Sequence, residues 1–345
     1  EPVPSLFRGF SAPVKLEAGY GDAELGVLLR HDEDPFCRWE AGQTLALRLR
    51  RELGATRQVG VGMSLDPVLR EALGEVLARS DLEPAYRAQA VTLPSANYLA
   101  QQLPVIDPDA VSEVRGFVRA ELGRALHARW REQYEANRED GPFSIEPAAM
   151  GRRALKNVAL AYLLWAGKGE GAELALAQYR GADNMTDRLA ALRGIAEAEL
   201  PEAEAALGAF YERWQSEPLV VNKWFGLQAT LERPDSVELV AALMRHPAFT
   251  LKNPNRVRAL LGSFATSNLP GFHRRDGAGY RLVVDSVLEL DPKNPSVAAR
   301  LLTALGRWRR FDPARQALMK AELERVLAKP GLSRDSYEIA SKSLA

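Results

Sequence analysis

Residues 253–258 read Asn253-Pro254-Asn255-Arg256-Val257-Arg258, and a second asparagine–proline pair follows at Asn294-Pro295-Ser296. An Asn or Asp side chain before proline accepts a hydrogen bond from a free backbone N–H at a helix start. The proline suits the first helical turn because its φ is fixed and its missing donor is not needed there. Both stretches therefore predict a helix that begins at the asparagine. The same pattern predicts helix starts at Asp34, Asp66, Asp107 and Asp312.

The apolar residues recur with the 3.6-residue period of a helix from about Asp22 to the end of the chain. In the segment that follows Asp107, for example, Val111, Val114, Val118 and Leu122 share one face. We find no convincing strand after residue 20. Helices of about 8–20 residues joined by short turns predict an all-α fold, in which antiparallel helix pairs stack into a superhelical array of the HEAT or armadillo kind. The repeat length is not constant, which excludes a consensus-type array.

Three short motifs help to place the helix boundaries. Ser80 followed by Glu83 has the form of a capping box and predicts the start of a short helix. The stretch Asp183-Asn184-Met185-Thr186-Asp187 is interpreted as a helix cap and not as a ligand loop. The pair Gly60 and Gly62 is interpreted as part of a loop between helices and not as a phosphate-binding loop.

Residues 1–17 differ from the rest of the chain. The stretch from Leu6 to Leu16 contains proline, glycine and apolar residues with period two, which predicts extended chain or one or two strands. So short a segment cannot form a sheet alone, so we interpret it as the end of a preceding β domain. This interpretation predicts a β remnant over 1–17 and a helical domain over 18–345. The first residue is Glu1 and not Met, which favours a piece of a longer protein.

The composition is that of an ordinary globular protein. The 345 residues are 46% hydrophobic and 26% charged, with a net charge of zero. The overall charge therefore gives no argument for binding nucleic acid or an anionic membrane. The single cysteine, Cys37, excludes an internal disulfide and a cysteine-rich zinc site, and fits a reducing cytoplasm. No signal peptide and no apolar run of about 18–20 residues is present, so we predict a cytoplasmic protein.

Positive charge is concentrated in one part of this neutral chain. Between Met244 and Arg310 there are twelve Lys or Arg residues and four Asp or Glu residues, an excess of eight. Arg256, Arg258 and Arg300 follow the two predicted Asn-Pro helix starts, where the helix end adds partial positive charge. Ser296 and Arg300 are spaced i, i+4 and share a face. This pattern indicates a carboxylate-binding site. The alternative is that these arginines are solvated surface residues.

No catalytic motif is present in the sequence. The four histidines are His31, His127, His246 and His273, and none has another histidine three to five residues away. The patterns H-E-x-x-H, G-x-S-x-G and the P-loop are absent. Taken alone, the sequence indicates a helical module with no catalytic residues and no metal ligands.

Several separated stretches resemble one family, bacterial aminopeptidase N. The resemblance covers essentially the whole chain, but only the C-terminal portion of that family: the last strand of its β-sandwich domain and its helical fourth domain. Asp183 stands where a second Asn is expected. The stretches are 6–14 (Leu-Phe-Arg-Gly-Phe-Ser-Ala-Pro-Val), 93–95 (Leu-Pro-Ser), 184–187 (Asn-Met-Thr-Asp), 223–229 (Lys-Trp-Phe-Gly-Leu-Gln-Ala), and 253–258 with 267–268 (Ser-Asn).

The resemblance implies a division of labour within a longer polypeptide. In that family an upstream domain binds zinc through H-E-x-x-H and a distant Glu, and holds the substrate's free N-terminus with G-A-M-E-N. None of these motifs is in this chain, so the resemblance implies that the chain alone cannot hydrolyse peptides. The helical domain encloses the catalytic chamber, and by position Arg258 and Arg300 face the substrate beyond the scissile bond. Ser296 is not the residue type expected beside Arg300.

The predicted function is that of the C-terminal domain of a zinc aminopeptidase, which restricts access to the chamber and helps to position the peptide. The predicted partners are the upstream domains of the same polypeptide and peptide substrates, with no nucleic acid and no membrane. The alternative is a free-standing HEAT-like scaffold that binds a protein or nucleic acid on its basic stripe. An upstream H-E-x-x-H in the same reading frame would exclude the scaffold. The predicted substrate-binding residues are Arg258, Arg300, Ser296, Asn255 and Arg256.

Overall fold

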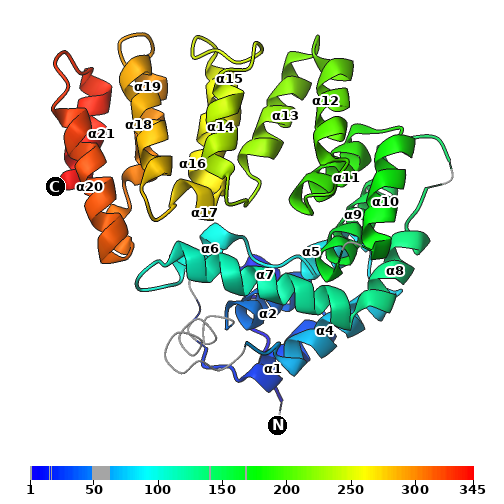
Figure 1. Ribbon diagram of the computed structural model, residues 1–345. Helices are drawn as coiled ribbons and strands as arrows, with labels where there is room; N and C mark the ends of the chain where they lie inside the picture. Colours follow the sequence, from blue (N-terminus) through cyan, green and yellow to red (C-terminus); the bar gives the residue numbers. More distant parts are fainter. Residues whose placement is uncertain (1, 15, 17, 49–62, 140, 168) are drawn as a thin grey trace. The chain divides into compact units, whose positions relative to one another are not determined.

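The computed structural model describes residues 2–14, 16, 18–48, 63–139, 141–167 and 169–345, so the loop predicted at Gly60 and Gly62 lies outside the described residues. These residues are largely helical and contain no strand (Figure 1). The elements are η1 (Arg8–Phe10), α1 (Asp22–His31), α2 (Pro35–Leu47), α4 (Pro67–Ala78), α5 (Pro84–Ala90), α6 (Ala96–Gln101), α7 (Pro108–Ala125), α8 (His127–Ala136), α9 (Pro147–Ala166), α10 (Gly169–Gly181), α11 (Met185–Glu197), α12 (Ala203–Trp214), α13 (Pro218–Ala229), α14 (Ser236–Met244), α15 (Pro254–Val257), η2 (Arg258–Gly262), α16 (Ser263–Ser267), α17 (Leu269–Phe272), α18 (Ala278–Leu290), α19 (Pro295–Leu302), η3 (Thr303–Leu305), η4 (Trp308–Arg310), α20 (Pro313–Leu327) and α21 (Arg334–Leu344).

The helices form two compact units. The first unit holds Glu1–Leu99 and Glu113–Leu200, and the second holds Ala100–Ser112 and Pro201–Ala345. Each unit has its own apolar core of leucine, valine, alanine and aromatic residues. The helical array expected from the 3.6-residue period is therefore confirmed.

An aromatic stack lies in the core of the first unit. The rings of Trp130 and Tyr162 are parallel within 2°, with their centroids 4.0 Å apart. The Tyr162 hydroxyl donates to the carbonyl oxygen of Val91 at 2.8 Å, so this buried polar group is satisfied. A glycine is needed where α7 crosses α9, because a Cβ at Gly123 would lie 2.5 Å from the Tyr162 carbonyl oxygen. The stack therefore joins α8, α9 and the end of α5.

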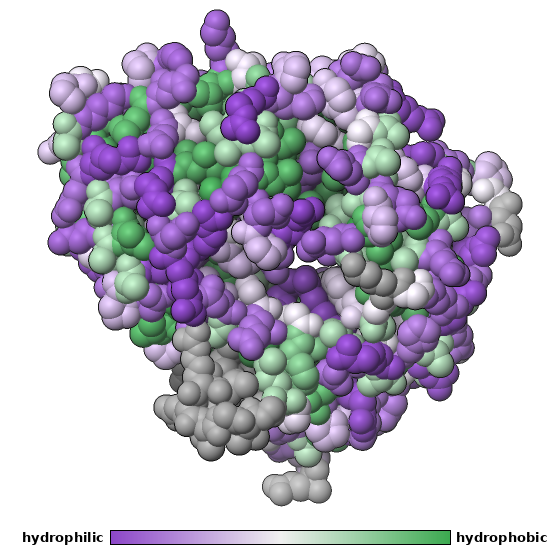
Figure 2. Space-filling model, viewed as in Figure 1, coloured by the Kyte–Doolittle hydropathy of each residue, from purple (hydrophilic) through white to green (hydrophobic). Residues whose placement is uncertain are grey.

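In the second unit, helices α12 to α21 stand side by side in chain order (Figure 1). Their outer surface mixes hydrophilic and apolar residues on the face shown in Figure 2. Phe264, Phe272 and Tyr280 are fully buried and meet edge to face. Asn268 is also buried. Its amide donates to the carbonyl oxygens of Ala229 (3.0 Å) and Leu231 (2.7 Å), so it satisfies acceptors at the end of α13.

All six helix starts predicted from an Asn-Pro or Asp-Pro pair are confirmed, because each proline is the first residue of a helix. The side chains cap as expected: Cys37 N–H donates to Asp34 at 2.8 Å, and Arg315 N–H donates to Asp312 at 3.1 Å. The capping box at Ser80 is wrong. Helix α5 begins at Pro84, because a residue before proline is pushed out of the helical region, and Glu83 accordingly has ψ 141°.

The described residues before α1 form a 3-10 turn, η1, and no strand. Phe7 and Phe10 have positive φ values of 58° and 53°, which reverse the chain at this point. The expected extended chain is therefore interrupted within residues 7–10. A domain boundary near residue 17 stays a prediction. Among the described residues, no helix is both long and apolar enough to span a membrane.

Candidate functional site

Three of the five predicted site residues line one groove in the second unit. Arg258, Ser296 and Arg300 border a cavity of about 850 Å³ between η2–α16 on one side and α19–η3 on the other. All three side chains are exposed. The remaining lining residues are small, apolar or hydroxyl-bearing: Gly262, Ser263, Ala265, Thr266, Val297, Ala299, Leu301, Thr303, Ala304 and Ile339.

The first wall of the groove is built on a widened helical turn. Residues Arg258–Gly262 form a π-helical turn, η2, between α15 and α16. Such a turn inserts one extra residue into a helix and is frequent at functional sites. Leu260, Leu261 and Phe264 point into the core, so Arg258 at the first position of the turn is left facing outward.

The second wall of the groove is α19. Asn294 caps this helix by accepting from the Val297 N–H at 3.3 Å. Ala298 and Leu302 are fully buried on the opposite face of α19, which leaves Ser296 and Arg300 together on the exposed face, as their i, i+4 spacing predicts.

Positive charge in the groove is not balanced by its own lining, since no Asp or Glu is among the lining residues. Arg258 Nη1 donates to the Asn255 side-chain oxygen at 3.0 Å, which is a neutral partner. The guanidinium of Arg300 forms no ion pair and no hydrogen bond with the described residues. Two guanidinium groups with no carboxylate partner make a receptor for an anion.

Asn255 and Arg256 lie outside the groove lining. Asn255 is exposed and contributes only by holding Arg258. Arg256 is buried: its Nε donates to the Ala248 carbonyl oxygen at 3.1 Å, and its Nη1 donates to the Pro218 carbonyl oxygen at 2.8 Å. Arg256 Nη1 also donates to Asn222.

The guanidinium of Arg256 lies 5.7 Å from the ring centroid of Phe225, and burial lowers its pKa. Arg256 therefore ties α13 to the segment before α15. The structure does not bring Arg256 into the groove, so it is not a ligand-binding residue of this site.

Of the hydroxyl-bearing residues in the lining, the sequence indicated Ser296 but not Ser263, Thr266 or Thr303. Thr266 donates its hydroxyl to the Gly262 carbonyl oxygen (2.8 Å), and Thr303 donates to the Arg300 carbonyl oxygen (2.7 Å). These hydroxyls can only accept from a ligand, because their protons are already engaged. The Ser296 hydroxyl has no partner among the described residues, so it is the hydroxyl that can donate to an anion beside Arg300. The spacing of Thr266 from Arg258 by eight residues could have indicated a shared face.

The described residues contain no group of three or more His, Cys, Asp or Glu side chains that could hold a metal ion. His273 is buried with its Nδ1 2.8 Å from the Tyr280 hydroxyl, and burial lowers its pKa to about 3. His246 lies edge-on to the ring of Tyr211, with the centroids 4.6 Å apart, and burial lowers its pKa too. Both are packing residues. The residues described here do not fit a zinc site.

Comparison with known proteins shows the family to which the chain belongs. Residues 22–345 match a family described as a domain of unknown function (DUF3458_C) with ARM repeats. Over its whole length the chain is 38% identical to aminopeptidase N of Escherichia coli, covering 40% of that protein. It is 41% identical to aminopeptidase N of Caulobacter vibrioides, covering 99% of this chain and 39% of that protein.

A solved structure of an aminopeptidase is also similar to this chain over its whole length. The crystal structure of Legionella pneumophila aminopeptidase A in complex with aspartic acid superimposes with a TM-score of 0.90 at 33% identity. All of this chain and 41% of that protein are covered. The chain thus spans about two-fifths of the length of the relatives it matches, and its resemblance to bacterial aminopeptidase N is confirmed. The chain belongs to the DUF3458_C family of ARM-repeat domains.

Proposed function

We propose that this chain is the C-terminal helical domain of a zinc-dependent aminopeptidase that removes N-terminal residues from peptides. In this role the domain caps the catalytic chamber, restricts the access of large substrates, and binds the free carboxylate of short peptides through Arg258 and Arg300. The observation that carries the proposal is the groove in which these two arginines face solvent with no acidic residue in its lining.

The chemistry of the groove fits a peptide terminus. A carboxylate accepts hydrogen bonds from guanidinium groups in a forked geometry, and the Ser296 hydroxyl adds a neutral donor on the same helix face as Arg300. The apolar residues Leu301 and Ile339 in the same lining can contact the aliphatic part of the last residue. The relatives named aminopeptidase N support a peptide as the ligand, in preference to nucleic acid or a protein scaffold partner.

Hydrolysis itself is assigned to the part of the longer protein that lies outside this chain. A zinc ion there would polarise the scissile carbonyl and activate a water molecule. The residues of this chain supply binding and orientation, which lower the barrier by holding the peptide in place. The chain alone is therefore expected to release no amino acid from a peptide or an anilide.

The test uses the longer polypeptide and two substrates. Replacing Arg300 by alanine should lower kcat/KM for a tripeptide with a free carboxylate by about three- to a hundredfold, since a charge-assisted contact contributes about 1.5–3 kcal/mol and solvent exposure reduces it. An amino-acid anilide has no carboxylate, so its kcat/KM should stay within about twofold. The matched control is Arg245→Ala, which removes an exposed arginine that does not line the groove.

Two outcomes would contradict the proposal. An equal loss for tripeptide and anilide would show that Arg300 stabilises the fold and does not bind the carboxylate. No loss for either substrate would show that Arg300 is an ordinary surface residue.

A further inference from the structure

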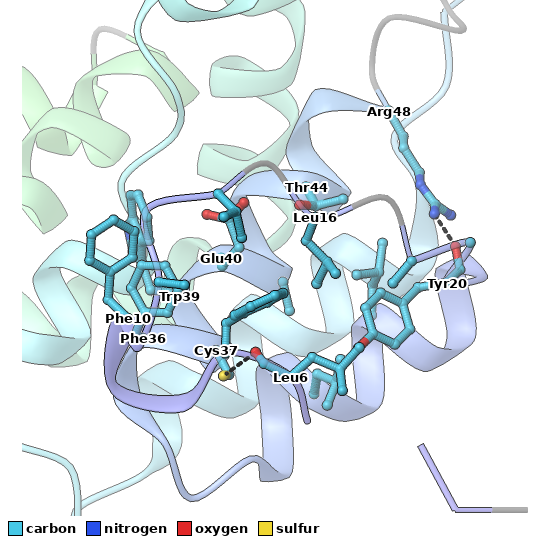
Figure 3. Close-up of a pocket in the computed structure, with 18 of the residues that line it drawn as sticks. Leu6, Phe10, Leu16, Tyr20, Phe36, Cys37, Trp39, Glu40, Thr44 and Arg48 are labelled. Atoms are coloured by element: carbon cyan, nitrogen blue, oxygen red, sulfur yellow. Dashed lines mark hydrogen bonds between the residues drawn. The ribbon is translucent and has the colours of Figure 1, made fainter. Parts of the chain in front are cut away.

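Two cavities in the described part of the first unit have the size of a small-molecule site. The larger one, about 610 Å³ between the residues before α1 and helices α1 and α2, has mostly aromatic and aliphatic walls (Figure 3). The smaller one, about 500 Å³, lies between α7, α9 and α11. Its lining combines apolar walls with charged groups of both signs, which is the combination that small-molecule sites use to select a ligand.

Two glycines let α7 and α11 approach α9 closely around the smaller cavity. A Cβ at Gly123 of α7 would lie 2.5 Å from the Tyr162 carbonyl oxygen of α9. On the other side, a Cβ at Gly194 of α11 would lie 2.4 Å from Cδ1 of Leu164, also on α9. Close packing therefore holds the three helices in place, and the cavity between them is already formed without a ligand.

The aromatic wall of this cavity is the ring of Trp165 on α9. The Tyr162 ring meets it edge to face, with the centroids 5.0 Å apart, and Tyr162 is itself stacked on Trp130 in the core. Arg119 of α7 lies over the same indole, with its guanidinium carbon 4.3 Å from the ring centroid. Trp165 is half-buried and lines the cavity, so the exposed part of its indole is available to a ligand.

A buried polar network fixes Asn157, the neutral polar residue of the lining. Its Nδ2 donates to Asp187 at 2.8 Å, and its Oδ1 accepts from Gln178 Nε2 at 2.8 Å. Asp187 is paired in turn with Lys156 at 2.6 Å, and both of these side chains are buried. The two charges balance each other inside the network, so they are not the charges that would meet a ligand.

The charged groups that border the cavity carry both signs. Arg119 and Arg193 are positive, and Glu197 is negative. Arg193 Nη1 donates to Glu197 Oε1 at 3.1 Å, in an i, i+4 pair on α11 whose side chains are 42% and 27% exposed. Such an exposed pair is weak, so either partner can exchange this contact for one with a ligand.

This lining favours one chemical class of ligand. A purely apolar molecule would leave the charged groups without a partner. A simple anion would be repelled by Glu197, and a simple ammonium compound would be repelled by the two arginines. A zwitterion meets both signs, since a guanidinium binds its carboxylate and a carboxylate binds its ammonium group. The apolar residues Leu160, Leu164 and Trp165 add a surface for an apolar side chain.

We propose that this cavity binds a free α-amino acid with a large apolar or aromatic side chain. Arg119 binds its carboxylate, Glu197 binds its ammonium group, and its side chain packs against Trp165 and Leu164. The inference rests on the lining of this cavity and not on the proposed function. An aminopeptidase would release ligands of this class.

The test follows the Trp165 ring itself in the longer polypeptide. After labelling with fluorotryptophan, the fluorine resonance of Trp165 is assigned as the one that disappears in Trp165→Phe. Titration with L-phenylalanine should shift this resonance saturably, with a Kd of about 0.1–10 mM, as expected for so small a ligand. Phenylpropionate lacks the ammonium group and phenylethylamine lacks the carboxylate. Each should bind about tenfold more weakly, because one charged group of the site is left unmet.

Two charge variants assign the two ends of the ligand. In Glu197→Gln the Kd of phenylalanine should rise about tenfold, whereas phenylpropionate, which has no ammonium group, should bind at least as well as before. In Arg119→Met phenylalanine should weaken by a similar factor, whereas phenylethylamine should not. Glu197→Gln changes an exposed pair, so it keeps the test decisive if Arg119→Met disturbs the packing of α7 on α9.

The matched control is Glu135→Gln. It breaks an equally exposed i, i+4 pair, with Arg131 on α8, in the same unit but outside the cavity lining. This variant should leave all three dissociation constants unchanged. A third variant, Ala190→Leu, fills the cavity without changing its charge and should abolish the shift of the Trp165 resonance.

Three results would overturn the proposal. The absence of a saturable shift at Trp165 would show that the cavity binds no amino acid. Equal affinities for phenylalanine, phenylpropionate and phenylethylamine would show an apolar pocket that does not recognise the two charges. Equal effects of Glu197→Gln and Glu135→Gln would show that Glu197 does not contact the ligand. None of these measurements uses turnover, so they fail separately from the carboxylate dependence at Arg300.

Discussion

Arg315 donates a hydrogen bond to Asp109 at 2.9 Å, although 206 residues separate them in the sequence. The side chain of Arg315 is 4% exposed, and it also donates to Asp312 at 2.8 Å and to the His273 carbonyl oxygen at 2.6 Å. One buried guanidinium therefore joins the start of α7, the loop before α18 and the start of α20 within the second unit.

Replacing Arg315 by methionine should lower the free energy of unfolding by about 1.5–3 kcal/mol, because the partly exposed carboxylates of Asp109 and Asp312 and the His273 carbonyl oxygen each lose a charge-assisted hydrogen bond from a buried guanidinium. Urea denaturation followed by circular dichroism measures the change. Arg275 provides the control. It also pairs with Asp109, at 2.6 Å, but its side chain is 72% exposed, so Arg275→Met should cost at most about 1 kcal/mol. Equal losses for the two variants would contradict this assignment.

His273 should make the protein less stable in acid. Burial lowers its folded-state pKa to about 3, below the usual 6.5, so the unfolded chain binds a proton that the folded protein does not. The stabilising effect is complete above about pH 6.5 and is lost as the pH falls toward 3, at about 1.4 kcal/mol per pH unit. In a His273→Gln variant the decrease in unfolding free energy between pH 7 and pH 5 should be smaller by about 2 kcal/mol.

The matched control for His273 is His31→Gln, at an exposed position in α1. This variant should keep the acid sensitivity of the unaltered protein. If His273→Gln keeps it as well, then carboxylates and not this histidine set the pH dependence.

Replacing Arg256 should lower the free energy of unfolding much more than replacing Arg258. Arg256→Met removes hydrogen bonds to Ala248, Pro218 and Asn222 from a buried site, which should cost about 2–4 kcal/mol. Arg258→Met removes an exposed side chain with one neutral partner and should change the unfolding free energy by at most about 0.5 kcal/mol. Thermal melts of the two variants, compared with the parent, test the difference. A large loss for Arg258→Met would mean that it stabilises η2.

Helix starts could be predicted from the sequence because their causes are local. The caps at Asp34 and Asn294 depend on one side chain and the proline that follows it. The start at Ser80 failed because Pro84, four residues on, has its own local requirement that overrides the capping box. The π-helical turn at η2 has no comparable signal in the sequence, since it depends on how Leu260 and Leu261 pack against neighbouring helices.

The site could be predicted only in part, because local sequence shows charge and spacing but does not show which side chains become buried by tertiary packing. Arg258 and Arg300 were found from charge and spacing, and the groove brings them together. Arg256 follows the same cap two residues before Arg258, and nothing in the local sequence distinguishes the two. Its burial is decided by Asn222 and Phe225 on α13, which approach it only in the folded chain.

Gly279 should tolerate no side chain. A Cβ there would lie 2.3 Å from the Phe272 carbonyl oxygen and 2.7 Å from that of Gly271, which are backbone atoms that cannot move aside cheaply. Gly279→Ala should therefore lower the free energy of unfolding by about 1–3 kcal/mol. Gly208, inside α12, has nothing within 4 Å of a Cβ, so Gly208→Ala should stabilise by up to about 1 kcal/mol. Chemical denaturation of both variants measures whether each substitution lowers or raises the free energy of unfolding. A stabilised Gly279→Ala variant would contradict the close approach of α17 and α18.

Arg258 and Arg300 are expected to bind the same peptide carboxylate. If both guanidinium groups contact one peptide terminus, removing either one weakens the contact of the other, and their effects are not additive. In the longer polypeptide, the double variant Arg258→Ala with Arg300→Ala should then lose less tripeptide kcat/KM than the product of the two single losses. The coupling energy should be about 0.5–3 kcal/mol.

The control pair combines Arg300→Ala with Arg245→Ala, two exposed arginines of which only Arg300 lines the groove. Their effects should multiply, because residues without a shared partner act independently. A purely multiplicative result for Arg258 and Arg300 would mean that they meet different parts of the substrate. The groove would then bind an extended peptide along its length, and the free carboxylate would be held by one arginine alone.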